Sequence, residues 1–576
     1  MKIPFSKFLC LLAVSLIVIS LLCSETPAWA APYTVINTND SGPGSLRQAI
    51  IDANAHAGED IISFNIPKTD PGYSPSTTGG WIIQPASLLP SLTGNNTIID
   101  GATQTTNQGD TNPLGPEITV NGLFLPVNSW VFSVESNANQ ILGLAICGAS
   151  ESGVQLILGA SGNIIKDNYI GIAANLSTGP WANHYGVRLH TSANGNVIAH
   201  NTISGNVSHG ILISDSNTDG NMIRRNTIGL DPTGTILKPN GGKGIYFLSG
   251  PKDNIVGGEE GYRNIISGNS QDGVYISTAH SNQITYNNIG LDESETKDMG
   301  NNGSGVFIIN ASTSNNVSNN LISGNADYGI YLSGSGTDYN IVRSNLIGWN
   351  KQLDESFPND KHGVGIYNGA QHNEIGNENN PNDYNTIIAS KWSGVAIVNA
   401  GSDHNTIANN VIVGNFYYGV GIVEAADNDI LYNEIWYNGV IEMAGVVVDG
   451  VNAVHNKIRQ NSIYDNNGLG IKLINGGNSN QIAPTISQAS CRQVSGTACA
   501  GCTVEIFSGE DDEGRYFEGA VTADPVTAVF SWSGLLHGPF VTTTASDAQG
   551  NTSQFSAPFS IGACPRIFLP LVVSND

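Results

Sequence analysis

Apolar residues in the middle of the chain recur in two short patterns. One reads Asn-x-Ile, as in Asn405-Thr-Ile, and the other reads Gly-Val-x-Ile, as in Gly419-Val-Gly-Ile. The glycine pattern returns about twelve times between Gly153 and Leu473, at spacings of 24 to 34 residues. A repeat of this length without helical periodicity predicts a solenoid of short strands. The Leu-x-x-Leu-x-Leu pattern of leucine-rich repeats, the main rival, is absent.

Each repeat has the composition expected of one turn, or rung, of such a solenoid. Alternate side chains of a strand point to opposite sides, so Val, Ile and Leu would fill the bore. Asn and Gly suit the corners, where the backbone needs left-handed or otherwise special angles. Asn side chains stacked from rung to rung can also form a ladder of amide hydrogen bonds. Residues 95–482 are therefore predicted to form a parallel β-helix.

Residues 31–94 are predicted to form an N-terminal cap and the first strands. Ser45 is a good helix N-cap, and Gln48 follows three residues later, as in a capping box. The apolar face of this helix would consist of Leu46, Ala49, Ile50 and Ala53. A stacked-repeat protein needs such a piece, because its first rung would otherwise expose an apolar end and a free strand edge.

Two stretches near the N-terminus resemble a known group of proteins. Ser45-Leu-Arg-Gln-Ala is similar to the Ser-Leu-Arg-Glu-Ala-type region of secreted bacterial β-helix proteins of the pectate-lyase-like superfamily, and Thr97-Ile-Ile-Asp-Gly also recurs there. Here Gln48 replaces the usual Glu, and Gly44 stands near where many members carry Cys. The resemblance implies an all-β fold, a right-handed parallel β-helix with an N-terminal capping helix. It does not decide activity, because the superfamily contains enzymes and non-catalytic proteins alike.

From Pro484 onward the repeat stops. Thr503-Val-Glu-Ile-Phe is an alternating strand, and Asp547-Ala-Gln-Gly-Asn is a hairpin turn signal. Residues 483–576 are therefore predicted to form a small Ig-like β-sandwich. It resembles the β-sandwich modules appended to many secreted bacterial proteins. The apolar tail from Ile567 fits either an edge strand or a sorting tag.

Residues 1–30 have the features of a signal peptide. Two lysines precede a long apolar run, and an Ala-Trp-Ala cleavage site ends at Ala30. Cys23 suggests a lipoprotein, but Leu22 before it is not the small residue that a lipobox needs. No later run is long enough to span a bilayer. We expect a secreted or cell-surface protein that is cleaved near Ala30 and does not span a membrane.

Cysteines cluster at the C-terminal end, as Cys491, Cys499, Cys502 and Cys564. In an exported chain these four predict two disulfides, with three possible pairings. The Cys499–Cys502 spacing also occurs in redox and zinc motifs, but no strand–helix context or partnering His accompanies it here. Cys147 stands alone among the repeats and is expected to be a small buried side chain.

The net charge of −25 limits the kinds of partner that the protein is expected to bind. A protein that binds nucleic acid would carry a basic stripe, and none is visible. An acidic, Gly-rich chain with few charged residues instead fits a soluble, exported protein, and we expect it to be a monomer.

The third residue of each glycine pattern should point outward from the solenoid. In four consecutive repeats this residue is aromatic: Tyr246, Tyr275, Phe307 and Tyr331. These rings would form an exposed ladder with a step of about 5 Å. Sugar rings stack on exposed flat rings, although aromatic side chains also favour strands and pack well on one another.

A second outward column precedes each glycine, and it carries His209, Lys243 and Asp272 on adjacent rungs. Arg188 and His190 lie one rung earlier. These groups could hold the carboxylates of a uronic-acid polysaccharide, which would acidify the neighbouring C5 proton for removal by a neutral base, as in a lyase or epimerase. Arg188, His209, Lys243 and Asp272 are thus candidate catalytic residues, and His190 a candidate ligand-binding residue. The alternative is a set of solvated surface charges.

A second patch combines aromatic and acidic residues. Its members are Lys391, Trp392, Phe416, Tyr417, Tyr418, Glu424, Glu442 and Asp449. Carboxylate pairs beside aromatic rings are typical of glycoside hydrolases, and Trp392 and Tyr418 would bind the sugar. The alternative is again an ordinary surface.

The longest repeats carry insertions after Asn-x-Ile-Gly. They span residues 172–184, 230–242, 291–303 and 349–361. Each is predicted to rise beside the Gly-Val-x-Ile face and to wall it. Asp231 and Asp292 recur in equivalent insertions, which makes calcium a candidate cofactor, although no complete ligand set is legible. No other metal or cofactor is expected.

Two functional hypotheses follow. In the first, the protein binds an extracellular polysaccharide along the Gly-Val-x-Ile face and acts on it as a lyase, epimerase or glycoside hydrolase. In the second, it is a non-catalytic cell-surface, adhesion or structural protein. The fold does not choose between them.

Overall fold

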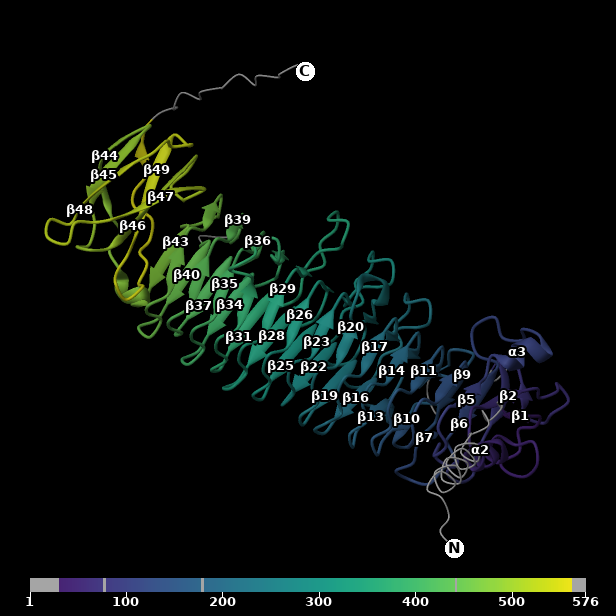
Figure 1. Ribbon diagram of the computed structural model, residues 1–576. Coiled ribbons are helices and arrows are strands. Elements are labelled where there is room, and N and C mark those ends of the chain that lie inside the picture. Colours follow the sequence, from purple (N-terminus) through teal and green to yellow (C-terminus); the bar gives the residue numbers. More distant parts are fainter. Residues whose placement is uncertain (1–30, 76–78, 178–180, 441–442, 562–576) are drawn as a thin grey trace, which may run out of the picture.

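The computed structural model describes residues 31–75, 79–177, 181–440 and 443–561. The predicted signal peptide (1–30), Glu442, Cys564 and the apolar C-terminal tail lie outside the described residues. Across the described ranges, no helix is long and apolar enough to cross a membrane. Figure 1 shows a rod of stacked rungs with a small module at its C-terminal end.

Three long sheets form the sides of the rod, and from β7 (Phe132–Val134) onward each rung contributes one strand to each sheet. Sheet A has fifteen strands, all parallel to their neighbours. They are β1 (Ala31–Val35), β2 (Asp60–Phe64), β5 (Thr97–Asp100), β8 (Gln140–Leu142), β11 (Ile164–Lys166), β14 (Val197–Ala199), β17 (Met222–Arg224), β20 (Ile255–Gly257), β23 (Gln283–Thr285), β26 (Asn316–Ser318), β29 (Ile341–Arg343), β32 (Glu374–Gly376), β35 (Thr406–Ala408), β38 (Asp429–Leu431) and β41 (Lys457–Arg459).

Sheet B also has fifteen strands and is parallel except for the pairing of its first two strands. They are β3 (Tyr73–Ser74), β4 (Gly80–Ile83), β6 (Ile118–Asn121), β9 (Leu144–Cys147), β12 (Tyr169–Ile170), β15 (Thr202–Ile203), β18 (Thr227–Ile228), β21 (Ile265–Ile266), β24 (Asn288–Ile289), β27 (Leu321–Ile322), β30 (Leu346–Ile347), β33 (Thr386–Ile388), β36 (Val411–Val413), β39 (Glu434–Trp436) and β42 (Ser462–Tyr464).

Sheet C holds the Gly-Val-x-Ile patterns in thirteen parallel strands. They are β7 (Phe132–Val134), β10 (Ser152–Leu156), β13 (Tyr185–Leu189), β16 (Ile211–Ser214), β19 (Ile245–Leu248), β22 (Val274–Ser277), β25 (Val306–Ile309), β28 (Ile330–Ser333), β31 (Val364–Tyr367), β34 (Val395–Val398), β37 (Val420–Val423), β40 (Val446–Asp449) and β43 (Ile471–Ile474). Two 3-10 turns, η1 (Glu260–Tyr262) and η2 (Gly477–Asn480), interrupt the corners. The predicted right-handed parallel β-helix is confirmed.

One apolar core fills the bore from end to end. Val187 and Ile211 of sheet C are fully buried, as are Ile198 of sheet A and Ile203 of sheet B. Burying such a side chain stabilises the fold by roughly 1.5–3 kcal/mol. Because every rung repeats these inward positions, the apolar contribution is spread along the whole rod.

Three stacks of asparagine follow the corners. Within each stack, the side-chain Nδ2 of one Asn donates to the Oδ1 of the next, at 3.0 Å from Asn196 to Asn221 and 3.0 Å from Asn201 to Asn226. The backbone N–H donates to the same oxygen. All of these amides are buried, and each finds its partner in the neighbouring rung. The amide ladders expected from the Asn-x-Ile pattern are therefore present.

The helix expected near Ser45 forms as α2 (Leu46–Ala55), and its predicted apolar face is buried. Ser45 Oγ accepts the N–H of Gln48 at 3.2 Å. The Gln48 side chain does not return this bond, because it donates to Asp52 instead. Only half of the expected capping box is therefore made. A second short helix, α3 (Thr103–Gln108), was not expected.

The insertions of the long repeats do not wall sheet C, so that prediction was wrong. Three of them are hairpins closed by antiparallel bridges, such as Leu291–Asp298. Leu291 and Phe357 pack against Leu321 on the outer side of sheet B, because apolar residues in the hairpins bury apolar residues of that sheet. In Figure 1 these loops rise from the side of the rod opposite the labels of β19, β22 and β25.

The chain ends in two antiparallel sheets, whose Ig-like identity stays a prediction. One sheet contains β44 (Thr485–Ser490), β45 (Gln493–Thr497) and β48 (Val529–Ser533). The other contains β47 (Tyr516–Thr522), β46 (Thr503–Gly509), β49 (Phe540–Ser546) and β50 (Phe559–Ser560). Val504, Ile506 and Phe530 belong to their shared core. We refer to residues 485–561 as the C-terminal module.

The cysteines behave largely as expected. Cys499 and Cys502 form a disulfide. Cys491 is also disulfide-bonded. Of the three pairings left open by the sequence, the structure contains the one that joins Cys499 to Cys502. Cys147 is free and buried, and burial raises the pKa of its thiol.

Candidate functional site

The outward side chains of sheet C align in the columns that the repeat predicted. Strand register places the third residues of the glycine patterns side by side, in the order Gln155, Arg188, Leu212, Tyr246, Tyr275, Phe307, Tyr331, Gly365, Ala396, Gly421, Val447 and Lys472. Every step of this column is one rung. Any ligand that follows the rod would therefore meet these residues in sequence order.

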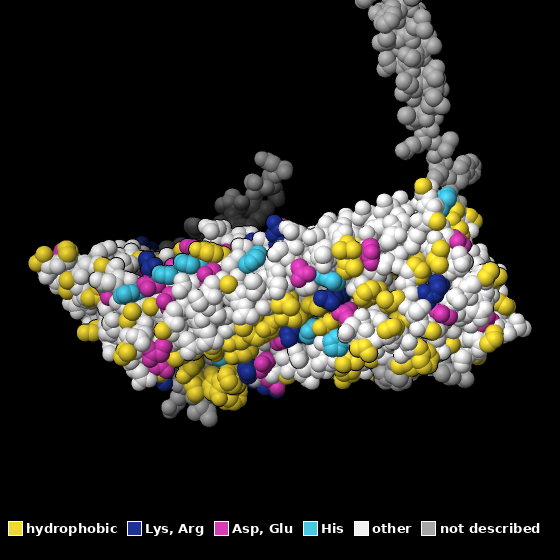
Figure 2. Space-filling model, turned by 90° about the horizontal axis from the view of Figure 1, so that it is seen from below, with side chains coloured by type: hydrophobic (Ala, Val, Ile, Leu, Met, Phe, Trp, Pro, Cys, Tyr) yellow, Lys and Arg dark blue, Asp and Glu magenta, His cyan; other side chains and the backbone are white. Residues whose placement is uncertain are grey.

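A continuous line of aromatic rings runs along this face, and we call it the aromatic strip. Its members are Tyr185, His209, Tyr246, Tyr275, Phe307, Tyr331, Tyr328, Tyr367, His362, Trp392 and Tyr417. Tyr246 and Tyr275 have centroids 5.2 Å apart, and Tyr275 and Phe307 5.0 Å. Figure 2, seen from below the view of Figure 1, shows an apolar band along the rod with Lys, Arg and His atoms beside it.

The aromatic strip changes column where the glycine pattern lacks a side chain. A methyl group at Gly365 would lie 2.9 Å from the Tyr328 ring and 3.1 Å from the Tyr367 ring. Tyr328 stacks on Tyr331 at 4.2 Å, and Tyr367 contacts the same ring at 5.4 Å. The bare glycine therefore makes room for two rings from neighbouring columns, and the ladder continues beyond Tyr331.

Sequence reasoning missed Tyr367 and the roles of Tyr328 and His362 in this continuity. The available signal was the coincidence of a bare Gly365 with a tyrosine two residues later, on the same face of the strand. Beyond this point, His362 contacts Trp392 at 5.2 Å, and Trp392 contacts Tyr417 at 6.4 Å.

The rings differ in how much surface they leave for a ligand. Tyr246, Tyr275 and Phe307 meet edge to face and are half-buried. Trp392 is 41% exposed and Tyr417 is 37% exposed. The surface open to stacking is therefore larger at the C-terminal end of the aromatic strip.

His209 is held as a neutral hydrogen-bond donor. Its Nδ1 accepts the backbone N–H of Lys243 at 3.1 Å. Burial, followed by the charge of Lys243, lowers the pKa of the imidazole to about 4. With Nδ1 occupied as an acceptor, Nε2 carries the proton and can donate to a ligand. This arrangement suits positioning of a hydroxyl or carboxylate better than removal of a proton.

Lys243 lies across the aromatic strip. Its Nζ donates to Gln271 Oε1 at 2.6 Å and stands 4.4 Å from the centroid of the Tyr275 ring. Burial lowers the pKa of the amine, and the charge of Asp272 opposes this shift. Lys243 is thus a cation–π partner of the strip as well as a charged group beside it.

Asp272 follows Lys243 by one rung. Its Oδ1 accepts the backbone N–H of Ser304 at 2.9 Å. Burial raises the pKa of the carboxyl, while the bond to Ser304 lowers it. His209 and Asp272 therefore use the same device, in which an outward side chain accepts an N–H from the next rung. The expected neighbourhood of His209, Lys243 and Asp272 is present.

Arg188 is not joined to that group. Its Nη1 forms an ion pair with Glu151 at 2.6 Å, on the opposite side from His209. His190 lies two residues later, just after the end of β13, and burial and the charge of Arg188 lower the pKa of its imidazole. The structure therefore places Arg188 and His190 at the N-terminal edge of the site.

Three positive side chains of the face have acidic partners, Arg188 among them. Lys361 pairs with Asp327 at 2.5 Å, and Lys391 pairs with Asp360 at 2.5 Å. In the cluster that the sequence suggested, Arg188 is paired with an acid, whereas Lys243 donates to the neutral side chain of Gln271. The face is therefore an aromatic strip on which most Lys and Arg side chains are paired, with Lys243 as the exception.

In the second patch, burial and the nearby charge of Asp449 raise the pKa of the Tyr418 phenol. Tyr418 is half-buried beside Gly421. Glu424 accepts the backbone N–H of Asn452 in the corner after β37, and Asp449 at the end of β40 accepts from Asn475. The contacts of both carboxylates are with corner residues.

The acidic residues of the insertions close their own loops. Asp231 Oδ1 accepts the N–H groups of Thr235 and Ile236, and Asp292 Oδ1 accepts those of Thr296 and Lys297. In the ranges that the structure describes, no three His, Cys, Asp or Glu side chains are grouped to hold a metal ion.

A trough that sequence reasoning missed lies on the outer side of sheet B. It has a volume of about 540 Å³ and is lined by Trp349, Val411, Val413, Trp436 and other apolar residues. It lies between the hairpin that begins at Trp349 and the outer side of β33, β36 and β39. The alternation of Val411 and Val413 was the available signal.

Comparison with known proteins gives one family and several structural likenesses. A family model described as periplasmic copper-binding protein (NosD) matches residues 180–289 and 233–356. These matches cover the central rungs and less than half of the chain. No curated protein gave a match.

Three solved structures illustrate the structural likenesses. The mannuronan C-5 epimerase AlgE6 A-module of Azotobacter vinelandii is 13% identical, with 77% of this chain and 98% of that chain covered and a TM-score of 0.36. The Dettilon tailspike protein is 11% identical, with 91% of each chain covered and a TM-score of 0.34. DFA-IIIase of Arthrobacter chlorophenolicus A6 is 12% identical, with 69% and 93% covered and a TM-score of 0.37. The fold of this chain is established by its own strand pairing, as a right-handed parallel β-helix.

Proposed function

We propose that this protein binds a polysaccharide along the aromatic strip of sheet C. The observation that carries the proposal is the unbroken run of ring contacts from Tyr185 to Tyr417, parallel to the rod axis. A polysaccharide is an extended chain of rings with apolar faces and hydroxyl edges. Aromatic faces fit the first feature, and donors such as His209 Nε2 fit the second.

The paired charges favour a neutral or weakly charged glycan. Lys361, Lys391 and Arg188 each have an acidic partner, so an anionic ligand would gain little from them. The net charge of −25 would also repel a polyanion. This modifies the uronic-acid polysaccharide suggested by the sequence. An exported or cell-surface monomer, with residues 1–30 as its signal peptide, remains part of the proposal.

Ring substitutions test the proposal. We expect Trp392→Ala and Tyr417→Ala each to weaken glycan binding about tenfold, because loss of one stacked ring costs roughly 0.5–1.5 kcal/mol beyond its buried area. Affinity electrophoresis against neutral and uronate glycans measures the effect. Tyr339→Ala is the matched control, because Tyr339 is an exposed ring that stacks on His372 away from the aromatic strip. Equal binding by all four proteins would overturn the proposal.

Lys243 and Asp272 favour catalysis as a second candidate function. They lie on adjacent rungs beside the aromatic strip, and burial shifts the pKa of each toward its neutral form. A lyase, epimerase or glycoside hydrolase needs such groups next to a bound sugar. Incubation with the same glycans, followed by absorbance of unsaturated products and by reducing ends, tests this function.

Turnover that is lost in Lys243→Met and Asp272→Asn, with binding retained, would establish catalysis at these residues. Binding without turnover on every glycan would favour the non-catalytic alternative, in which the rod displays a glycan-binding face at the cell surface.

A further inference from the structure

The last rung of a parallel β-helix leaves three strand edges open. Here these edges belong to β41, β42 and β43, the final strands of sheets A, B and C. An open edge presents unpaired N–H and C=O groups on which another strand can be laid. The amide ladders add to this, because each Asn donates toward the C-terminal neighbour, as Asn438 does to Asn466. Considered without the C-terminal module, the last rung therefore leaves N–H donors that have no acceptor within the rod.

The C-terminal module supplies an acceptor for each edge. In β41, Ile458 donates its N–H to Thr552 Oγ1 at 3.0 Å. In β42, Ile463 and Gly514 exchange two backbone hydrogen bonds, at 3.0 Å and 2.9 Å. In β43, Leu473 donates its N–H to Gln554 Oε1 at 3.0 Å. One module thus satisfies all three sheets.

Acidic side chains of the module accept hydrogen bonds from N–H groups at the corners of the last rung. Asn466, the end of one ladder, donates its N–H to Glu513 Oε2 at 3.0 Å and its Nδ2 to the same carboxyl group at 3.3 Å. Glu513 therefore occupies the place of the next asparagine. Gln460 donates its N–H to Glu505 Oε2 at 3.0 Å. Glu505 is 1% exposed and Glu513 2% exposed, so both carboxyl groups are enclosed by the junction.

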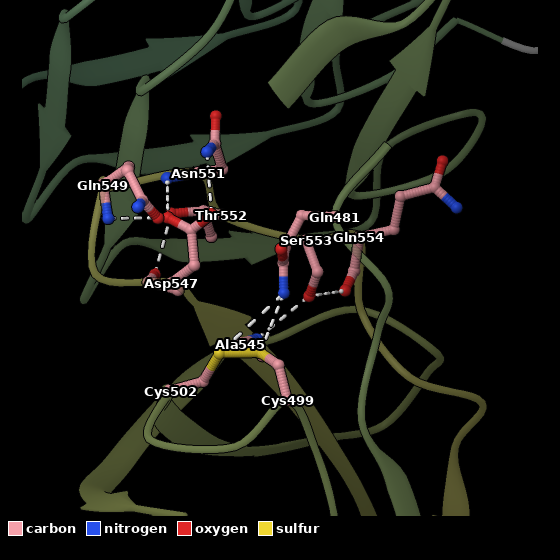
Figure 3. Close-up of a disulfide and its surroundings, with 11 residues drawn as sticks. Gln481, Cys499, Cys502, Ala545, Asp547, Gln549, Asn551, Thr552, Ser553 and Gln554 are labelled. Atoms are coloured by element: carbon pink, nitrogen blue, oxygen red, sulfur yellow. Dashed lines mark hydrogen bonds between the residues drawn. A yellow bond between two sulfur atoms is a disulfide. The ribbon is translucent and has the colours of Figure 1, made fainter. Parts of the chain in front are cut away.

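The connection between rod and module is also fixed. Asn478 Nδ2 donates to the backbone oxygen of Thr552 at 3.0 Å. Gln481, at the start of the connection, donates to Cys499 Sγ at 2.9 Å. Figure 3 shows Gln481 directed at the Cys499–Cys502 disulfide, with the turn from Asp547 to Thr552 beside it. The disulfide therefore braces the segment that joins the module to the last rung.

We propose that the C-terminal module is a plug that ends the β-helix and covers a surface on which a second copy of this chain would otherwise bind. The complementarity is chemical, since donors of the rod meet oxygen acceptors of the module at each edge. A second copy with its plug displaced is the partner that fits the exposed end, because its open strand edges carry both N–H and C=O groups and can pair with those of β41, β42 and β43. This role is independent of glycan binding.

Hydrogen exchange on the full chain tests the plug directly. We expect the amides of Ile458, Ile463 and Leu473 to be as protected as those one rung earlier, at Ile430 and Ile435. Mass spectrometry of peptides after timed exchange measures this protection. Exchange of the last-rung amides at the rate of an open strand edge would overturn the proposal without any variant.

A pair of substitutions tests the consequence of losing the plug. In the full chain, Glu505→Ala with Glu513→Ala removes acceptors of the junction. We expect last-rung exchange roughly tenfold to a hundredfold faster, since hydrogen bonds to charged or buried carboxyl groups are lost, and association of the chain in light scattering.

Glu518→Gln is the matched control, because Glu518 is a buried carboxylate whose partner His537 lies within the module. The control should keep the protected last rung and the monomeric mass. The plug would be refuted if the double variant exchanged and scattered like this control.

Discussion

Ser390 is the one position, among the described rungs of the third amide ladder, where a residue other than Asn interrupts the stack between Asn359 and Asn415. Its N–H donates to Asn415 Oδ1 at 3.0 Å, but its buried hydroxyl has no partner. The side chain is also too short to receive the amide of Asn359. An unpaired buried group costs more than a missing bond, because its interaction with water has been lost.

We expect Ser390→Asn to stabilise the protein by roughly 0.5–1.5 kcal/mol, the usual net worth of one buried hydrogen bond. The new amide would accept from Asn359 and donate to Asn415, as in the neighbouring rungs. Denaturant unfolding monitored by circular dichroism measures the change. The reverse change in an intact ladder, Asn325→Ser, should destabilise the chain, and a stable Asn325→Ser variant would contradict the argument.

His362 should make stability depend on pH. The residue is 7% exposed, and burial lowers the pKa of its imidazole to about 4. The unfolded chain takes up the proton first as the pH falls, so this stability is complete above about pH 6.5 and is lost between there and about pH 4. The loss is on the order of 3 kcal/mol. His362→Asn keeps an acceptor for Ser393 and should flatten the profile of unfolding free energy against pH, whereas an unchanged slope would contradict the assignment.

Single residues also mark the limit of what the sequence could predict at the site. The strand period predicted that Tyr246, Tyr275, Phe307 and Tyr331 face outward together. It gave no information on ring orientation, so the edge-to-face packing that half-buries them emerged only in three dimensions. The donor role of His209 depends on a backbone N–H of the next rung. The spacing of residues in the sequence does not show that this N–H reaches the imidazole.

At the scale of elements, the rung is the unit of construction. Residues 305–328 form one complete rung without a hairpin, containing β25, β26 and β27. If this rung were removed, each ladder would lose one Asn, and Asn301 would then donate to Asn359. Repeat proteins tolerate such changes because each unit contacts only its neighbours.

We therefore expect deletion of residues 305–328 to leave a folded rod that is about 4.8 Å shorter. Circular dichroism would show the same strand content per residue, and X-ray scattering would show the reduced length. Deletion of residues 305–316 alone is the matched control, since half a rung shifts the register of everything that follows. Folding of the control and unfolding of the full-rung variant would contradict the modular picture.

The strands could be predicted because period and corner chemistry agree in every repeat. The insertions could not be placed correctly from the sequence. Their position in the repeat fixes the corner of the rung at which each insertion begins, but it does not fix which sheet the insertion packs against. That side is set by contacts such as Leu291 with Leu321, which join residues thirty positions apart in the chain. The same long-range packing creates the trough beside Trp349.

At the scale of the whole molecule, the aromatic strip and the rod axis are parallel. A ligand that follows the strip gains contacts as it lengthens. We expect affinity to rise with oligosaccharide length until the span from Tyr185 to Tyr417 is covered, with no further gain beyond it. Titration calorimetry with size-fractionated oligosaccharides measures this dependence. A plateau already at the disaccharide would limit the site to one pair of rings.

The direction of the amide ladders has an electrical consequence. In the described rungs, each Asn-to-Asn step of the ladders donates toward the C-terminal end, so the dipoles of the side-chain amides add along the axis instead of cancelling. The ladders therefore contribute a dipole whose positive end lies where Glu505, Asp511 and Glu513 stand. The amides of the rod and the carboxyl groups of the C-terminal module thus face one another with complementary polarity.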